Sequence, residues 1–188
     1  DVAGNLEAWP SNDSYGDVST TVVLSDPTPP VMSSLTTSPQ TWSNANWFTV
    51  SWAALDTESG VAYYAYKTNG VETQTTGTLL TGAFAYQEGQ NIFSVRAVNG
   101  VGATSGSLVD TLYYDPTLPV SVMTALPSTW LDTNPLVLNW SGFDGTSGVG
   151  SYDIEYRIQP SGAWTTWLTG TTTVAGTFAP GSWQLNEI

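Results

Sequence analysis

The strongest constraint on the fold is an internal repeat with an offset of 88 residues. The matching pairs are Trp42 and Trp130, Trp52 and Trp140, Asp56 and Asp144, and Tyr64 and Tyr152. The triplet Ser59-Gly60-Val61 recurs at the same offset, and Asp26-Pro27-Thr28 recurs as Asp115-Pro116-Thr117, shifted by one residue. Self-similarity at a fixed offset is the signature of repeated structural units. The sequence therefore predicts two copies of one domain.

Within each copy, apolar and polar side chains alternate over short segments. Phe48, Val50 and Trp52 alternate with hydroxyl residues, and the segments 136–140, 152–157 and 93–97 show the same period of two. This alternation predicts strands with one buried face, and turn-forming residues separate them. No segment has a helical stripe. About seven short strands in roughly 90 residues predict an all-β fold of tandem antiparallel β-sandwiches without significant helix.

The motifs of the repeat resemble those of a known domain family. Each copy has Asp-Pro-Thr, a strand ending in tryptophan, Asp-x-x-Ser-Gly-Val and a tyrosine-rich strand, and the later copy adds Trp164-Thr165-Thr166-Trp167-Leu168-Thr169-Gly170. This order resembles the fibronectin type III or Ig-like repeats of bacterial or archaeal secreted and cell-surface proteins. Residues 1–10 resemble the loop after the sixth strand of such a repeat. The resemblance implies an Ig-like fold and no particular activity, because such domains serve many proteins.

The repeat register divides the chain into three predicted segments. Residues 1–25 correspond to the last loop and final strand of a preceding repeat, and residues 26–114 to a complete sandwich. Residues 115–188 correspond to a sandwich that is incomplete at its C-terminal end, and the chain opens at Asp1 without a recognisable signal peptide. Two interpretations follow. The chain is a piece of a longer repeat protein, or the first strand of one copy completes the open sandwich of the next.

Composition excludes several classes of function. The 188 residues include 3 basic and 16 acidic side chains, a net charge of −13, and no histidine or cysteine. Zinc, haem and iron–sulfur sites, and histidine or cysteine catalysis, therefore lack their side chains. The three cations, Lys67, Arg96 and Arg157, are too few for binding to nucleic acid or an anionic membrane. No apolar run is long enough for a membrane span, and the Thr/Ser/Asn-rich composition favours an extracellular or cell-surface location.

Six carboxylates near the predicted loops and repeat junctions are candidate calcium ligands. They are Asp26, Asp56, Glu58, Asp110, Asp115 and Asp144. Calcium prefers hard oxygen ligands, and junction aspartates that meet a neighbouring loop could fix the angle between two repeats. No spacing matches an EF-hand loop, and aspartate before Pro or Ser-Gly also accepts hydrogen bonds from turn amides. Calcium and a purely structural turn both stay open, and no other cofactor is required.

Tryptophans, sequons and a carboxylate pair give three further candidates. Trp164, Trp167 and Trp47 could stack sugar rings as a glycan platform, although large aromatic residues mostly fill interiors. Asn12 and Asn139 begin Asn-x-Ser sequons and are predicted, exposed glycosylation sites. Glycoside hydrolysis would need a pair such as Asp153 and Glu155, with one buried acid, but the alternation puts both on the solvent side. We therefore predict that the chain is not an enzyme.

Together these observations predict a non-catalytic extracellular structural protein. It would be a rod-like repeat spacer, or a fibre or surface-layer subunit assembled head to tail by strand donation. Prolines restrict both predicted linkers, which suits a stiff rod. Its partners would be neighbouring repeats or identical subunits. The alternative is a carbohydrate- or protein-binding accessory module of a secreted enzyme or adhesin, with a surface glycan as its partner.

Overall fold

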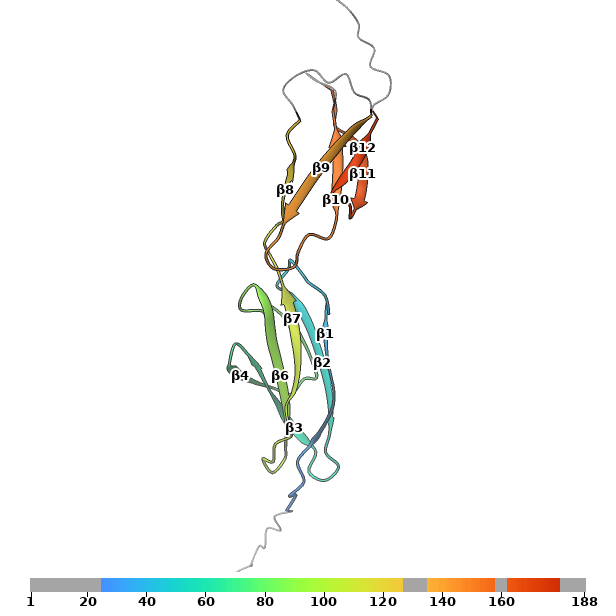
Figure 1. The fold of residues 1–188 in the computed structure, drawn as a ribbon. Coiled ribbons are helices and arrows are strands. Elements are labelled where there is room, and N and C mark those ends of the chain that lie inside the picture. Colours follow the sequence, from blue (N-terminus) through green and yellow to red (C-terminus); the bar gives the residue numbers. More distant parts are fainter. Residues whose placement is uncertain (1–24, 127–134, 158–161, 180–188) are drawn as a thin grey trace, which may run out of the picture.

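The computed structural model describes residues 25–126, 135–157 and 162–179, which form two β-sandwiches (Figure 1). The strands of the first sandwich are β1 (Val31–Ser38), β2 (Phe48–Leu55), β3 (Val61–Thr68), β4 (Val71–Thr75), β5 (Leu79–Gly82), β6 (Gly89–Asn99) and β7 (Leu108–Tyr114). Those of the second are β8 (Val120–Met123), β9 (Leu136–Phe143), β10 (Tyr152–Tyr156), β11 (Thr165–Thr171) and β12 (Ala175–Phe178).

Pairing between these strands is antiparallel throughout. The described residues contain no helix, and therefore none long and apolar enough to cross a membrane. The predicted fold class, all-β with tandem antiparallel sandwiches, is confirmed.

The first sandwich consists of a three-stranded sheet, ordered β1-β2-β5, and a four-stranded sheet, ordered β4-β3-β6-β7. The predicted alternation in β2 is confirmed, because Phe48, Val50 and Trp52 are buried and the residues between them are partly exposed. The same pattern holds in β6, where Phe93 and Val95 are buried. The inward faces of the two sheets therefore meet in one core.

Aromatic rings form the centre of that core. The Phe93 ring lies parallel to Tyr66 at a centroid distance of 5.5 Å and meets the edge of Phe84 at 5.6 Å. Trp52 lies 6.1 Å from Phe93 and 5.6 Å from Tyr64. Strands from both sheets thus contribute to one aromatic cluster, which holds them face to face.

The second sandwich consists of a three-stranded sheet, ordered β12-β9-β8, and the two-stranded pair β10-β11. Its buried centre is Trp140 on β9, which lies 6.4 Å from Tyr152 and 6.0 Å from Trp167. The predicted alternation of β10 is confirmed, with Ile154 buried and Asp153 exposed. Among the described strands, β10 pairs only with β11, so its other edge has no partner there.

The strands of the first sandwich end at Tyr114 and those of the second begin at Val120, and residues 115–119 connect them. The sandwiches follow one another along the long direction of the molecule (Figure 1). The segment predicted as a spare strand, 1–25, lies outside the described residues except for Ser25. Residues 180–188, at the C-terminal end of the sandwich predicted to be incomplete, also lie outside them.

Candidate functional site

The linker between the sandwiches is held by a buried aspartate. Asp115 is 5% exposed, and its carboxylate accepts hydrogen bonds from the backbone amides of Thr117 (3.0 Å) and Ser147 (2.9 Å). Ser147 lies in the loop between β9 and β10, so this one carboxylate connects the linker to the second sandwich. The Asp115 amide donates to the carbonyl of Ser43 (2.9 Å), in the first sandwich. Asp115 therefore contacts both sides of the junction.

A second aspartate shapes the loop that Asp115 binds. Asp144 Oδ1 accepts hydrogen bonds from the amides of Thr146 (3.0 Å), Ser147 (2.9 Å) and Gly148 (3.0 Å). These amides, that of Thr146 foremost, lower the pKa of Asp144. Gly148 has a φ of 78°, a left-handed conformation that glycine adopts without strain. The Asp-x-x-Ser-Gly sequence is thus a preformed turn that presents the Ser147 amide.

Glu88 bridges the same three parts of the chain. It lies in the loop before β6 and accepts hydrogen bonds from the hydroxyl of Thr117 (2.8 Å) and from that of Thr146. Thr117 belongs to the linker and Thr146 to the second sandwich. A cleft of about 430 Å³ lies beside these contacts, and Trp42, Asp115, Leu118, Asp144 and others line it.

The same arrangement occurs before the first sandwich. Asp26 is 6% exposed and accepts hydrogen bonds from the amides of Thr28 (2.9 Å) and Ser59 (3.2 Å) and from the Ser59 hydroxyl (2.5 Å). Asp56 Oδ1 accepts from the amides of Ser59 (3.0 Å) and Gly60 (2.9 Å), as Asp144 does in the later copy. We call this pair of aspartates with their serine the aspartate–serine junction. It is repeated in both sandwiches.

At the earlier junction, two further residues complete the set. Asn99, 2% exposed, donates from Nδ2 to Asp26 Oδ2 (2.9 Å). A hydrogen bond with Glu58, and then that from Ser59, lowers the pKa of Asp26 to about 2. The same contact with Asp26 raises the pKa of Glu58, because a carboxyl group must hold a proton to donate to a carboxylate.

The six candidate calcium ligands do not form one site. Asp26, Asp56 and Glu58 lie at the earlier junction, and Asp115 and Asp144 lie at the later one. Asp110 lies elsewhere and accepts from the Thr37 hydroxyl (2.8 Å), which connects β7 to β1. Within the described part of the chain, no group of three or more acidic side chains is placed to hold a metal ion. The turn hydrogen bonds account for these aspartates, and calcium binding stays a prediction.

The three tryptophans of the predicted glycan platform are not brought together. Trp47 is 63% exposed on the first sandwich, and Trp164 is 60% exposed on the second. Trp167 packs inward, 6.0 Å from Trp140 and 5.0 Å from Phe178. The pattern of β11 turns Trp167 toward the core, and a glycan platform stays a prediction. Trp164 stands alone, with the Arg157 guanidinium 4.8 Å from its ring centroid.

The remaining candidates are on the surface. Asn139 is exposed on β9, as the sequon prediction requires, and Asn12 lies outside the described residues. Asp153 and Glu155 are both exposed, and Asp153 accepts a hydrogen bond from the Gly170 amide (2.8 Å). Neither carboxylate has the burial that a general acid needs.

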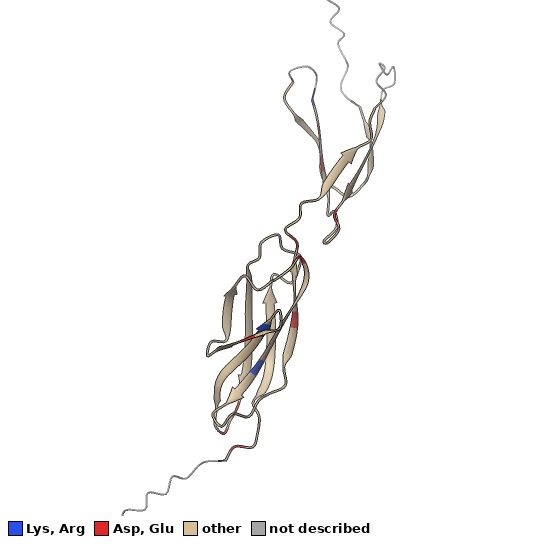
Figure 2. Ribbon diagram, turned by 90° about the vertical axis from the view of Figure 1, so that its left-hand side faces the viewer, with Lys and Arg blue, Asp and Glu red and all other residues tan. Residues whose placement is uncertain are grey.

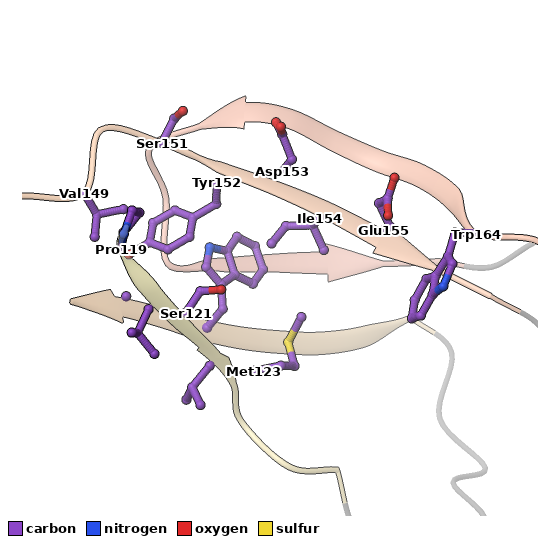
Figure 3. Close-up of a pocket in the computed structure, with 14 residues that line it drawn as sticks. Pro119, Ser121, Met123, Val149, Ser151, Tyr152, Asp153, Ile154, Glu155 and Trp164 are labelled. Atoms are coloured by element: carbon purple, nitrogen blue, oxygen red, sulfur yellow. The ribbon is translucent and has the colours of Figure 1, made fainter. Parts of the chain in front are cut away.

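A groove of about 590 Å³ opens the second sandwich between β8 and β10. Figure 3 shows Pro119 and Val149 at one end of the groove and Trp164 at the other. Trp140 and Ile154 also line it. On β8, Val120 and Val122 pair with Phe143 and Ser141 on the outer face of the sheet and are 69% and 62% exposed. Ser121 and Met123 pair with Gly142 and Trp140, on the face that looks into the groove (Figure 3).

Sequence reasoning missed the partners of the junction aspartates, namely Ser59, Ser147, Asn99 and Thr146, and it missed Glu88, which binds the threonines of the later junction. A signal for the serines was present, since Ser-Gly-Val recurs at the same distance after an aspartate in both copies. Nothing in the local sequence marks Glu88 or Asn99, which reach the junction from distant loops.

No protein-family model and no curated protein matches this chain. Among solved structures, it is similar to carbohydrate-binding modules from the β-sandwich superfamily, at 17% identity and a TM-score of 0.43, covering 61% of this chain and 49% of that one. It is also similar to the PKD1 domain of Vibrio anguillarum Epp, at 15% identity and a TM-score of 0.35, covering 47% of this chain and 98% of that one.

A third similar structure is the chitinase ChiA74 from Bacillus thuringiensis, at 17% identity and a TM-score of 0.43, covering 85% of this chain and 28% of that one. The chain thus spans about half of the length of the carbohydrate-binding structure and less than a third of the chitinase. Similarities this distant assign no function to this chain.

Proposed function

We propose that this chain is a non-catalytic extracellular structural module, a stiff spacer whose sandwiches are fixed end to end by the aspartate–serine junction. The repetition of this junction carries the proposal. Asp26 with Ser59, and Asp115 with Ser147, make the same contact at the start of each sandwich. A contact repeated at each domain entry sets the same geometry between successive repeats.

The linker supports a stiff junction because it is short and bonded on both sides. Only five residues, 115–119, separate the sandwiches, and Pro116 and Pro119 have restricted φ angles. Glu88 of the first sandwich accepts from Thr146 of the second, so the two bodies are also bonded directly. Rotation about the linker would break these contacts together with those of Asp115.

The surface charge suits a spacer in solution. Many acidic residues lie near the loops at the ends of the sandwiches, and the few basic residues lie at isolated positions (Figure 2). With a net charge of −13, neighbouring rods repel one another, which opposes lateral association.

Spin-label distance measurements test the proposal. The sequence has no cysteine, so labels can be attached at Ile92→Cys in the first sandwich and Val137→Cys in the second, both at exposed positions. A stiff junction predicts one narrow distance distribution. The double variant Asp115→Ala/Glu88→Ala should broaden it at least twofold, whereas Glu155→Gln, an exposed acid on β10, should not. A broad distribution in the parent protein, or no effect of the double variant, would refute the spacer.

The same samples test the predicted calcium. If calcium joins Asp115 and Asp144, millimolar calcium narrows the distribution and excess chelator reverses the change. An identical distribution in both conditions would leave the hydrogen bonds alone as the cause of stiffness and would remove calcium from the proposal.

Glycan binding is a second candidate function, favoured by the exposed Trp164 ring at the end of the groove (Figure 3). Exposed aromatic faces with adjacent polar groups are typical of sugar sites. Retention on insoluble polysaccharides, lost in Trp164→Ala and kept in Trp47→Ala, would support this function. Equal retention of both variants, or none, would refute it.

A further inference from the structure

The groove in the second sandwich has the form of a vacant strand position. It lies between β8 and β10, and polar and apolar residues line it in similar measure. Its apolar part is formed by Met123 of β8, opposite Trp140, and by Ile154 of β10. The outer edge of β10 has no partner among the described strands. A free edge with an apolar face beside it is the arrangement that accepts an added strand.

The first sandwich shows what fills this position. Tyr152 of β10 matches Tyr64 of β3 in the internal repeat, so β10 is the counterpart of β3. The edge of β3 is paired with β6, with Tyr64 opposite Ala97 and Tyr66 opposite Val95. Val95 and Ala97 are buried there, at 1% and 0% exposure. The groove therefore suits an extended segment with apolar side chains at alternate positions.

Residues 17–25 have the sequence of such a segment. All but Ser25 lie outside the described part of the chain, and Val18, Thr20, Val22 and Leu24 occupy alternate positions. They directly precede Asp26-Pro27-Thr28, as β7 directly precedes Asp115-Pro116-Thr117. The seven described strands of the first sandwich include none of these residues, so that sandwich does not require them.

A second copy is placed to supply this segment. The described chain begins at the end of the first sandwich that lies away from the second sandwich and its groove (Figure 1). Two copies stacked end to end bring residues 17–25 of one beside the groove of the other. The segment then leads into Asp26, which binds Ser59 of its own copy as Asp115 binds Ser147.

From this juxtaposition we infer that residues 17–25 of a second copy of the chain add as a strand to the free edge of β10 and cover the groove. The inference deepens the proposed function and rests on it, because the added copy is held through the same aspartate–serine junction. Successive copies form a head-to-tail filament in which every junction is alike.

Disulfide cross-linking between two full-length variants tests the inference. One variant carries Val22→Cys and the other Ser121→Cys, at an exposed β8 position that lines the groove (Figure 3). Because the chain has no cysteine of its own, the disulfide that joins the two variants can form only between these positions. Oxidation of the mixture should give a dimer of about 40 kDa from the 20.0 kDa chains. The control Ser141→Cys, exposed on β9 and outside the groove lining, should give at least tenfold less.

A blocking variant makes the test specific for the groove. Met123→Arg, added to the Ser121→Cys copy, should reduce the dimer at least tenfold, because Met123 faces the groove opposite Trp140, and Val137→Arg, on the outer face of β9, should not. Circular dichroism shows whether Met123→Arg is folded. If it is not, competition by a peptide of residues 15–26 replaces it, with a scrambled peptide as control. Loss of dimer with the native peptide alone supports the inference.

Three outcomes would overturn the inference. A dimer yield equal to that of Ser141→Cys, or one insensitive to both Met123→Arg and the peptide, rules out the strand. A monomer-sized disulfide in a single Ser121→Cys/Leu185→Cys chain, with no intermolecular product, would assign the groove to residues of the same copy. The spin-label distribution of the monomer tests the spacer separately, so either proposal can fail while the other stands.

Discussion

Phe93 offers the sharpest test of the sandwich architecture. Its side chain is fully buried on β6 and contacts three aromatic rings, those of Tyr66, Phe84 and Trp52. Burial of a phenylalanine contributes about 1.5–3 kcal/mol, and each aromatic pair adds about 0.5–1.5 kcal/mol. Phe93→Ala should therefore lower the free energy of unfolding of the first sandwich by about 4 kcal/mol, within the range of about 3–5 kcal/mol for buried Phe-to-Ala changes.

Fragment-resolved hydrogen exchange separates the two sandwiches and gives this free energy directly. Amides of β2, β3 and β6 should exchange about a thousandfold faster in Phe93→Ala, since about 1.4 kcal/mol corresponds to a factor of ten. Amides of β9 in the second sandwich should be unaffected.

Ile92→Ala is the matched control, because Ile92 is the neighbouring residue on β6 and is 51% exposed on the opposite face. Its cost should stay below about 1 kcal/mol, as expected for surface positions. Equal costs for the two variants, or a cost below about 1.5 kcal/mol for Phe93→Ala, would mean that the inward face of β6 has been assigned incorrectly.

Two further predictions concern packing and acid stability. Gly176→Ala should destabilise the second sandwich by about 1–3 kcal/mol in thermal unfolding, because its new Cβ would lie 2.8 Å from Trp167 Cη2, whereas Gly150→Ala, with no atom within 4 Å, should be neutral. Asp26, with its pKa lowered from 3.8 to about 2, stabilises the fold above pH 4 and loses this contribution as the pH falls from 4 to 2. Asp26→Asn should flatten that part of the stability curve, and an unchanged slope would contradict the assignment. The pKa of Glu58 is raised instead, so the charged carboxylate present at pH 7 destabilises the fold. Glu58→Gln should therefore increase the free energy of unfolding at pH 7.

The strands were predictable because a one-sided sheet requires period-two alternation. Phe48, Val50 and Trp52 of the first copy have apolar counterparts 88 residues later. The same strand was therefore predicted independently in each copy. The sequence alone did not separate Trp167 from the exposed Trp164. The two lie three residues apart, and only the position of Trp140 and Phe178 beneath β11 shows which ring is inside.

The aspartates were identified from their sequence setting, but their partners were not. Asp56 and Asp144 cap a turn that is local in sequence, which the Asp-x-x-Ser-Gly motif predicts. Asp26 and Asp115 bind serines about thirty residues away, and Glu88 binds a threonine in the other sandwich. Contacts between loops that are distant along the chain depend on how the sheets pack, and no local pattern records them.

The sequence by itself determined that the chain is all-β, that its unit is repeated, and that no histidine or cysteine side chain is available to a site. These follow from side-chain period and composition, which are properties of the chain before it folds. Only the tertiary structure decided that the junction aspartates accept hydrogen bonds from turn amides, that Trp167 packs inward, and that one edge of β10 has no partner among the described strands and lies beside a groove. These depend on which loops and sheets meet in space, and that arrangement is set by packing of the whole sandwich rather than by any one segment.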